Sequence, residues 1–342
     1  MNDHSQGDAL DRQPLLRIEN LSKDFDVSPP LLNRIFGGGG RVLLSAVSGI
    51  NFSIPRGQTF SLVGESGCGK STVARLIVGL YEPTGGEIHF DDQDLSAQRT
   101  RAETIAIRKR MQMIFQDPFA SLNPRWRVVD IIAEPIRMHR LVTGRLETIA
   151  RVAELLTQVG LAPADGEKFP HEFSGGQRQR ISIARALASA PEFLVCDEPT
   201  SALDVSVQAQ ILNLMKDLQR ELGLTYLFIS HDLAVVNHIS DYVGVMYLGK
   251  IVEWTDAKTL FNQPRHPYTR MLLDAIPDLE MSGRARTPVA GEVPNPISPP
   301  SGCHFHPRCP HAEARCRTEA PSAQLHGNAR IACHAVEEGR LS

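Results

Sequence analysis

The sequence contains 342 residues, with 36 Lys and Arg against 39 Asp and Glu, which gives a formal net charge of -3 at pH 7. This balance excludes a nucleic-acid binder that relies on bulk positive charge. No stretch approaches the roughly 18 consecutive apolar residues of a membrane-spanning helix. The polar start MNDHSQGDALDRQP lacks the basic and then apolar layout of a secretory signal. The chain is therefore expected to stay in the cytosol, where any membrane role requires a partner.

The first third of the chain predicts strands around one glycine-rich turn. Residues 1–14 form a loose polar tail, and the Pro- and Gly-rich stretch 28–41 is expected to be an insertion or long turn. Alternating Ile50, Phe52 and Ile54 indicate a half-buried strand. The remaining elements expected here are a strand at 15–25, a strand at 59–63 that leads into a helix at 71–80, and a strand with a turn at 87–95.

The middle of the chain changes character at about 126–172, where a helical segment is expected. Apolar residues at three- and four-residue steps predict an amphipathic helix over 146–161, and a second helix is expected over 176–189. The apolar runs 193–196 and 224–230 indicate buried parallel strands, whose carboxyl ends present chemistry.

The last part of the chain has two predicted regions. Residues 242–254 indicate a hairpin that turns at Gly249 and Lys250. Beyond about 262 the sequence becomes rich in Pro, His and Cys, so a boundary is placed there. The fold class is α/β, with a large domain over 15–261 and a small loop-rich C-terminal region over 262–342.

The glycine-rich turn GESGCGKS, residues 64–71, matches the pattern G-x-x-x-x-G-K-[ST] between a strand and a helix. In such a loop the backbone N–H groups surround phosphates, and the positive end of the following helix faces them. Lys70 can reach the β- and γ-phosphates, and the Ser71 hydroxyl suits Mg²⁺. A flexible glycine turn is the alternative, but the motif in this context predicts that the chain binds a nucleoside triphosphate.

Two further motifs complete the predicted site. In FLVCDEPTSALD, residues 193–204, Asp197 is placed to hold Mg²⁺ and Glu198 to polarise attacking water, although two acids that cap a strand would look the same. The stretch FSGGQRQR, residues 173–180, offers either a second anion cradle or a Ser-capped helix start. One nucleotide rarely needs two cradles, whereas two chains that face each other would use both.

Taken in order, GESGCGKST, FSGGQ, VCDEPTSALD and ISHDL resemble the nucleotide-binding subunit of an ATP-binding-cassette (ABC) transporter. The resemblance extends from about residue 15 to the C-terminus, with Phe173 where the family usually has Leu. It implies a RecA-like P-loop core with an antiparallel β subdomain and a helical subdomain. It also implies a head-to-tail dimer of cassettes with two ATP molecules between them.

The resemblance implies roles for individual residues. The phosphates would be surrounded by Gly64, Glu65, Ser66, Gly67, Cys68, Gly69, Lys70, Ser71 and Thr72. The Mg²⁺ shell would include Ser71, Gln116 and Asp197. Glu198 would be the general base, and His231 would sense the γ-phosphate. The ATP held by the partner cassette would contact Ser174, Gly175, Gly176 and Gln177, while Asp204 would lie in the loop that crosses between the two sites.

Three of these residues have simpler interpretations. Phe25 would stack on adenine according to the resemblance, but a core or loop Phe fits the pattern as well. Gln116 could be a plain polar loop residue rather than a link through which the membrane partner detects ATP. His231 could be a structural histidine.

The C-terminal segments HPYT (266–269), PNPISPPSGCHFHPRCPHA (294–312) and IACH (331–334) resemble the ATPases of dipeptide and oligopeptide importers. The resemblance implies a subunit that hydrolyses ATP to drive import of di- or oligopeptides, at the cytoplasmic face of the membrane. Its implied partners are a second, non-identical ATPase subunit, two transmembrane permease subunits and an external solute-binding protein, with no nucleic acid. The insertion at 28–46 fits one of the two ATPase subunits.

Other functions remain open at this stage. Related importers carry nickel, glutathione or other small solutes. A different class would be a soluble ABC ATPase in translation or repair. Two features of this chain count against that class: it has one copy of each motif, and the stretch between Lys70 and Asp197 is short. A stand-alone iron–sulfur regulator is a third possibility that a complete hydrolytic set does not favour.

Six cysteines fall into two groups. Cys303, Cys309, Cys316 and Cys333 have the spacing C-x5-C-x6-C-x16-C, which suits a [4Fe–4S] cluster, a structural zinc site or packed thiols. The family resemblance favours the cluster, with His304, His306 and His311 as spare ligands or surface residues. Cys68 and Cys196 are expected to be packing residues. The basic stretch 99–110 is expected to be a solvated helix face.

Overall fold

The computed structural model describes residues 13–28, 42–97, 99–275 and 291–341. Most of the predicted polar tail and of the predicted insertion at 28–41 therefore lies outside the described residues. The chain divides into two compact units. The first comprises the segment up to Leu15, Ile54–Thr59 and Ala97–Ser230, and the second comprises Leu16–Ser53, Phe60–Ser96 and the chain from His231 onward.

The first unit contains three parallel strands. β7 (Phe193–Asp197) pairs with β6 (Met111–Ile114) on one side and with β8 (Thr225–Ile229) on the other. Every residue of β7 and β8 is buried, because both are continuous apolar runs covered on both faces. The strands predicted at 193–196 and 224–230 are confirmed.

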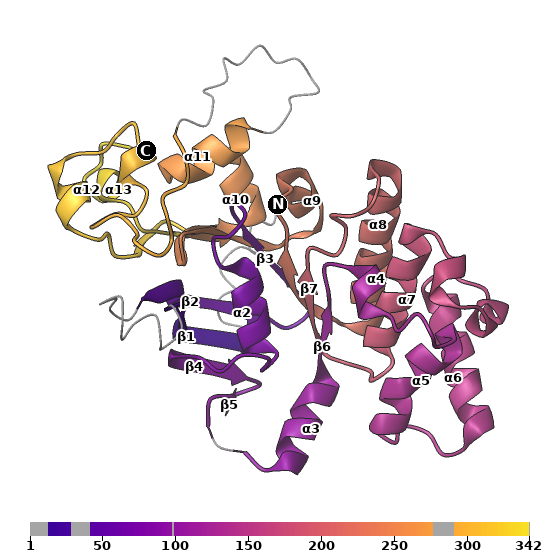
Figure 1. Cartoon of the computed structure of the whole chain (residues 1–342). Helices are drawn as coiled ribbons and strands as arrows, with labels where there is room; N and C mark the ends of the chain where they lie inside the picture. Colours follow the sequence, from indigo (N-terminus) through magenta and orange to yellow (C-terminus); the bar gives the residue numbers. More distant parts are fainter. Residues whose placement is uncertain (1–12, 29–41, 98, 276–290, 342) are drawn as a thin grey trace, which may run out of the picture. The chain divides into compact units, whose positions relative to one another are not determined.

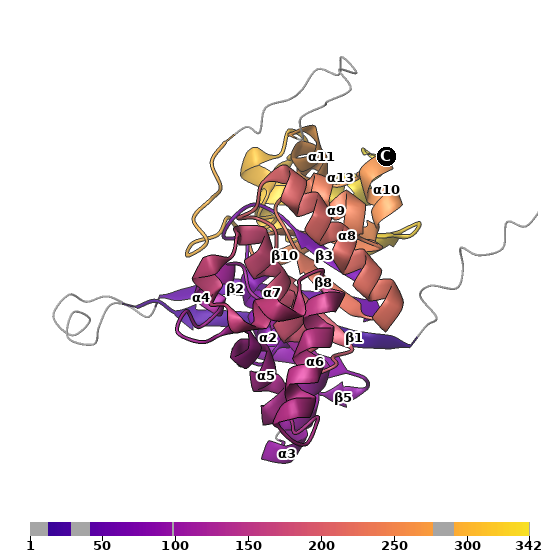
Figure 2. The same ribbon diagram turned by 90° about the vertical axis from the view of Figure 1, so that its right-hand side faces the viewer.

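Helices make up most of the rest of the first unit. They are α3 (Arg101–Arg110), α4 (Pro118–Ser121), α5 (Val128–Met138), α6 (Arg145–Gln158), α7 (Gly175–Leu187) and α8 (Val205–Leu222), with short 3-10 turns η1 (Pro163–Glu167) and η2 (Pro170–Glu172). Figure 2 shows α5 and α6 side by side. The helix predicted over 146–161 is confirmed, and Val152, Leu156 and Val159 of its predicted apolar stripe are buried. Leu146 and Ile149 were predicted to belong to that stripe but are exposed.

The second unit contains an antiparallel four-stranded sheet in the order β2 (Leu43–Pro55), β1 (Pro14–Asp26), β4 (Gly85–Phe90) and β5 (Gln93–Asp94), visible at the lower left of Figure 1. Leu16 pairs with Phe90 across this sheet, and both are buried. The insertion predicted for 28–46 extends too far, because β2 already begins at Leu43: its apolar residues pair as a strand.

The other strands of the second unit include the one that precedes the glycine-rich turn. β3 (Thr59–Val63) pairs in parallel with β9 (Tyr242–Tyr247), which forms a hairpin with β10 (Lys250–Asp256). The hairpin turns at Leu248 and Gly249, both at positive φ, one residue earlier than predicted. Two C-terminal strands, β12 (Ala329–Ile331) and β11 (Gln324–His326), continue from the edge of β10.

Short helices complete the second unit (Figure 1). They are α2 (Lys70–Ile77), α9 (Leu233–Ile239), α10 (Ala257–Asn262), α11 (Pro267–Asp274), η3 (His306–Arg308), α12 (Ala314–Thr318) and α13 (His334–Glu337). Val63 at the end of β3 shares a hydrophobic core with Tyr268 and Phe305 of the C-terminal region. Among the described residues, no helix has the length and apolar character needed to cross a membrane.

Candidate nucleotide-binding and catalytic site

The glycine-rich loop between β3 and α2 passes close to neighbouring backbone. A Cβ on Gly64 would lie 2.1 Å from the carbonyl oxygen of Met246, and a Cβ on Gly69 would lie 2.2 Å from that of Ala46. Both glycines have positive φ, at 150° and 111°. Only glycine meets both conditions, so the loop has the compact course that a phosphate cradle requires.

Lys70 lies inside this loop. Lys70 is only 4% exposed, and its ammonium donates hydrogen bonds to the carbonyl oxygens of Gly64 at 2.8 Å and Glu65 at 3.0 Å. The charge therefore stays within the loop and is paired only with neutral carbonyls in these contacts. A buried ammonium in this setting is well placed to bind the phosphates of a nucleotide.

Two residues that the sequence did not indicate contact the same loop. The Arg308 guanidinium donates to both carboxylate oxygens of Glu65, at 2.7 and 2.9 Å, and the backbone N–H of Glu65 donates to the Tyr268 hydroxyl at 2.9 Å. Tyr268 belongs to the HPYT segment that marked the family resemblance. Its partner is more than 200 residues away in the chain, so no local pattern could have identified the contact.

Phe25 and His231 also belong to the second unit. Phe25 lies at the end of β1, half-buried, with Tyr81 edge-on at 5.4 Å between ring centroids and the Lys23 ammonium 5.2 Å from its ring. His231 is exposed and precedes Asp232, which caps α9. Their predicted roles toward adenine and the γ-phosphate stay predictions.

The first unit contains the predicted catalytic acids. Asp197 is the last residue of β7 and is buried, and Glu198 follows it with φ at 47°, a conformation that is uncommon for a residue with a side chain. The Gln116 side-chain amide donates to a carboxylate oxygen of Glu198 at 2.9 Å. The structure therefore brings together two residues that lie 82 positions apart and that the sequence assigned to the metal and the attacking water.

The FSGGQ segment starts α7 with a complete capping box. The Ser174 hydroxyl accepts a hydrogen bond from the backbone of Gln177, whose side chain accepts one from the backbone of Ser174. A Cβ on Gly176 would lie 2.4 Å from Cγ1 of Val207 on α8, so this glycine permits the helices to pack closely. The Ser-capped helix start is confirmed, and binding of a partner's ATP stays a prediction. Asp204 caps α8 through the Val207 N–H.

The four C-terminal cysteines lie in or beside three short elements. Cys303 and Cys309 flank η3, Cys316 lies in α12 and Cys333 directly precedes α13. Cys303 donates through its backbone to the Cys316 carbonyl at 2.9 Å. Burial raises the pKa of the Cys303, Cys309 and Cys333 thiols, that of Cys309 to about 11.

These cysteines do not form a site for a single zinc ion. Tetrahedral zinc would bring thiolates to about 3.8 Å from one another. Among the described residues, no three of these sulfurs lie within 4.8 Å of one another. The predicted zinc alternative therefore does not fit the structure.

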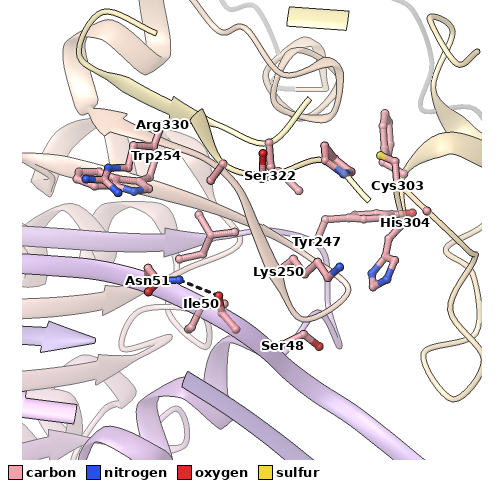
Figure 3. Close-up of a pocket in the computed structure, with 18 residues that line it drawn as sticks. Ser48, Ile50, Asn51, Tyr247, Lys250, Trp254, Cys303, His304, Ser322 and Arg330 are labelled. Atoms are coloured by element: carbon pink, nitrogen blue, oxygen red, sulfur yellow. Dashed lines mark hydrogen bonds between the residues drawn. The ribbon is translucent and has the colours of Figure 1, made fainter. Parts of the chain in front are cut away.

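A separate cavity of about 410 Å³ lies in the second unit (Figure 3). Its walls come from β2, the β9–β10 hairpin and the C-terminal region. They include Lys250, His304 and Arg330, with Arg330 placed over the Trp254 ring at 5.8 Å, and none of the described residues that line the cavity is acidic. The cavity is therefore basic and partly aromatic.

Comparisons with known proteins agree with this arrangement. The family described as "ABC transporter" matches residues 47–201, and "Oligopeptide/dipeptide transporter, C-terminal region" matches residues 252–316. The chain is 48% identical to the oligopeptide transport ATP-binding protein AppF of Bacillus subtilis (strain 168), covering 95% of this chain and 98% of AppF. It is 44% identical to the dipeptide transport ATP-binding protein DppF of Escherichia coli (strain K12), covering 98% of each.

Solved structures show the same class. The ATP-binding cassette MJ0796, solved as a dimer in a post-hydrolysis state with ADP and Pi, superimposes with a TM-score of 0.61 at 27% identity, covering 71% of this chain and 98% of that one. The fold and the phosphate loop thus define a P-loop ABC ATPase. Within that class, the chain belongs to the family of ATP-binding subunits of oligopeptide and dipeptide ABC transporters.

Proposed function

We propose that this chain hydrolyses ATP to drive the import of di- or oligopeptides. The observation that supports this most strongly is the presence in one chain of an ABC cassette over 47–201 and an oligopeptide/dipeptide transporter C-terminal region over 252–316. Relatives that match nearly the full length carry names of the same kind.

The proposed reaction divides the work among the predicted residues. The backbone of residues 64–72 and the Lys70 ammonium bind the triphosphate, while Ser71, Gln116 and Asp197 would hold Mg²⁺. When bound there, Mg²⁺ would supply charge neutralisation at the phosphates. Glu198 accepts the proton of the attacking water, and His231 senses the γ-phosphate. The hydrogen bond from Gln116 supports this assignment, because it keeps the Glu198 carboxylate oriented.

Transport requires other chains. We propose a second, non-identical ATPase subunit that forms a dimer with this chain. Its nucleotide site is completed by Ser174, Gly175, Gly176 and Gln177 of this chain, and the second subunit completes the site of this chain in the same way. Two transmembrane permease subunits would carry the solute, and an external binding protein would deliver it. Attachment to the permeases would place this chain at the cytoplasmic face of the membrane, in agreement with the absence of a membrane-spanning helix among its described residues.

The test is uptake of labelled di-, tri- and pentapeptides, with nickel in parallel, in cells that carry either the native chain or Glu198→Gln. The variant is expected to bind ATP but lose peptide uptake, because general bases contribute about 10²- to 10⁴-fold to rate. Glu221→Gln, on the exposed surface of α8, is the control. Lost nickel uptake with intact peptide uptake would instead indicate a metal importer.

We also propose that the four C-terminal cysteines bind a [4Fe–4S] cluster, in which each thiolate binds a different iron, so that the sulfurs need not meet at one ion. Their place in one small region supports this proposal. Cluster binding would deprotonate thiols that burial otherwise keeps neutral. Anaerobic purification followed by iron analysis tests the proposal, with Cys68→Ala and Cys196→Ala as controls. Protein without iron and without visible absorption would contradict it.

A further inference from the structure

The phosphate loop has a charge partner in the C-terminal region. Glu65, the second residue of the GESGCGKS loop, has both carboxylate oxygens bound by the Arg308 guanidinium, at 2.7 and 2.9 Å. The Arg308 side chain is only 2% exposed, whereas that of Glu65 is 25% exposed. We propose that Arg308 is a positioning residue for ATP, which neutralises Glu65 and fixes the phosphate loop from the C-terminal region. This inference rests on the proposed ATPase function.

Arg308 is itself firmly held. Its guanidinium lies 5.8 Å from the Tyr247 ring and 5.9 Å from the Phe305 ring, and it also donates to the Tyr247 hydroxyl at 3.5 Å. Both aromatic residues belong to the core that includes Val63 of β3. A planar guanidinium packed against rings loses little freedom when it binds a carboxylate at two points. The contact is therefore built into the core rather than formed by a flexible surface side chain.

A second contact fixes the backbone of the same loop residue. The Glu65 N–H donates to the Tyr268 hydroxyl, and Tyr268 is fully buried. Tyr268 is positioned by His266, whose Nδ1 accepts from the Tyr268 N–H at 3.0 Å and so caps α11. The side chain and the backbone of Glu65 thus both have partners in the C-terminal region. Arg308 and Tyr268 supply them, and both come from the part of the chain that distinguishes this family.

The sign of the charges explains why a partner is needed. A phosphate loop binds a polyanion, and a free carboxylate on the loop would repel it. Arg308 cancels that charge through its two contacts with the Glu65 carboxylate. Removal of Arg308 should therefore weaken ATP binding, and simultaneous removal of the Glu65 charge should restore it. A purely structural role for Arg308 would not give such a rescue.

The experiment measures the affinity for a fluorescent ATP analogue and steady-state ATPase kinetics of the full chain. The variants are Arg308→Met, Glu65→Gln and the double variant, since Met keeps an apolar stem against Tyr247 and Phe305. We expect Arg308→Met to weaken nucleotide binding about tenfold or more, the scale on which broken charge pairs act. In the double variant most of this loss should disappear. The KM should change and the kcat should change little, because no bond-breaking group is altered.

Two further variants make the result decisive. Arg308→Lys keeps the charge but not the two-point contact, so it should fall between the native chain and Arg308→Met. Arg315→Met is the control, because the Arg315 guanidinium lies in the same region but pairs with Glu319 and Glu338. This variant should leave ATP binding unchanged. Melting temperatures identify any variant that fails to fold. If Arg308→Met fails to fold, Arg308→Lys takes its place, both alone and combined with Glu65→Gln.

Several outcomes would overturn the inference. Native affinity in Arg308→Met would show that Glu65 needs no partner, and additive losses in the double variant would show that the two residues act independently. A native chain that binds no ATP would refute the proposed function instead. The two failures are therefore distinguishable.

Discussion

Single glycines determine how closely the phosphate loop can pass its neighbours. Gly69 combines a φ of 111° with a Cβ position only 2.2 Å from the Ala46 carbonyl oxygen, whereas Gly57 has a φ of 74° and open space around it. Gly69→Ala should therefore shift the loop, lower stability by about 2–4 kcal/mol and remove most ATP binding. Gly57→Ala should cost only about 1 kcal/mol of backbone strain. Chemical denaturation and nucleotide titration of both variants provide the measurement, and equal effects would contradict the close approach.

His266 gives the second unit a pH-dependent stability. Burial lowers its pKa from the usual 6.5 to about 3, so the folded protein keeps this ring neutral where the unfolded chain protonates it. Its contribution is complete above pH 6.5 and is lost as the pH falls from 6.5 toward 3, by up to about 1.4 kcal/mol per pH unit.

The comparison with His266→Asn isolates this effect, because Asn can cap α11 without titrating. The variant should lose less stability than the native chain between pH 6.5 and 4. Burial raises the pKa of the neighbouring Glu253, which titrates with the opposite sign, but it is present in both chains and cancels in the difference. If the free energy of unfolding changed with pH equally in both chains, His266 would not be the source of the pH dependence.

At individual positions, the sequence located the glycine-rich loop between β3 and α2 but not the residues that contact it. Lys70 and the glycines were found because their chemistry depends on a short continuous pattern. Arg308 and Tyr268 were not, because their contacts with Glu65 depend on the folded course of β9, β10 and α11. The Gln116–Glu198 hydrogen bond lies between these cases: both residues were identified, but their contact follows from the pairing of β6 with β7.

At the scale of elements, the packing of α7 on α8 depends on a missing side chain. A Cβ on Gly176 would lie 2.4 Å from Cγ1 of Val207. Gly176→Ala should force the helices apart and destabilise the first unit by about 1–3 kcal/mol, as overpacking usually does. Val207→Ala removes the clashing methyl group, so the double variant should regain much of the loss. Thermal unfolding of the three variants tests this, and a double variant less stable than Gly176→Ala would refute the packing explanation.

Element prediction failed in two places, and the two failures have different causes. α8 was not predicted, although Asp204 offers a cap and Ile211, Leu212, Met215 and Leu218 form a buried stripe that could have revealed it. The shift of the β9–β10 turn by one residue has a different cause. Both Leu248 and Gly249 adopt positive φ, and a leucine in that conformation is not expected from sequence.

At the scale of the whole molecule, the C-terminal region completes a sheet and a core. β12 pairs with β10, and Phe305 packs with Val63 and Tyr268. Deletion of residues 291–341 should therefore expose the edge of β10, lower the melting temperature, promote aggregation and weaken ATP binding. Leu325→Ser, at an exposed position of β11, is the control that leaves the region in place. A truncated chain that melts and binds ATP as the native chain does would show that the region is an independent appendage.

The pairing of Glu65 with Arg308 also has a consequence for how the protein is made. The two residues are 243 positions apart, so a ribosome that adds about 5–20 residues per second needs roughly 10–50 s to reach the arginine after the glutamate. During that interval the glycine-rich loop exists without its arginine and tyrosine partners. The nucleotide site therefore acquires its final form only near the end of translation, and a nascent chain interrupted before residue 308 lacks the charge partner of its phosphate loop.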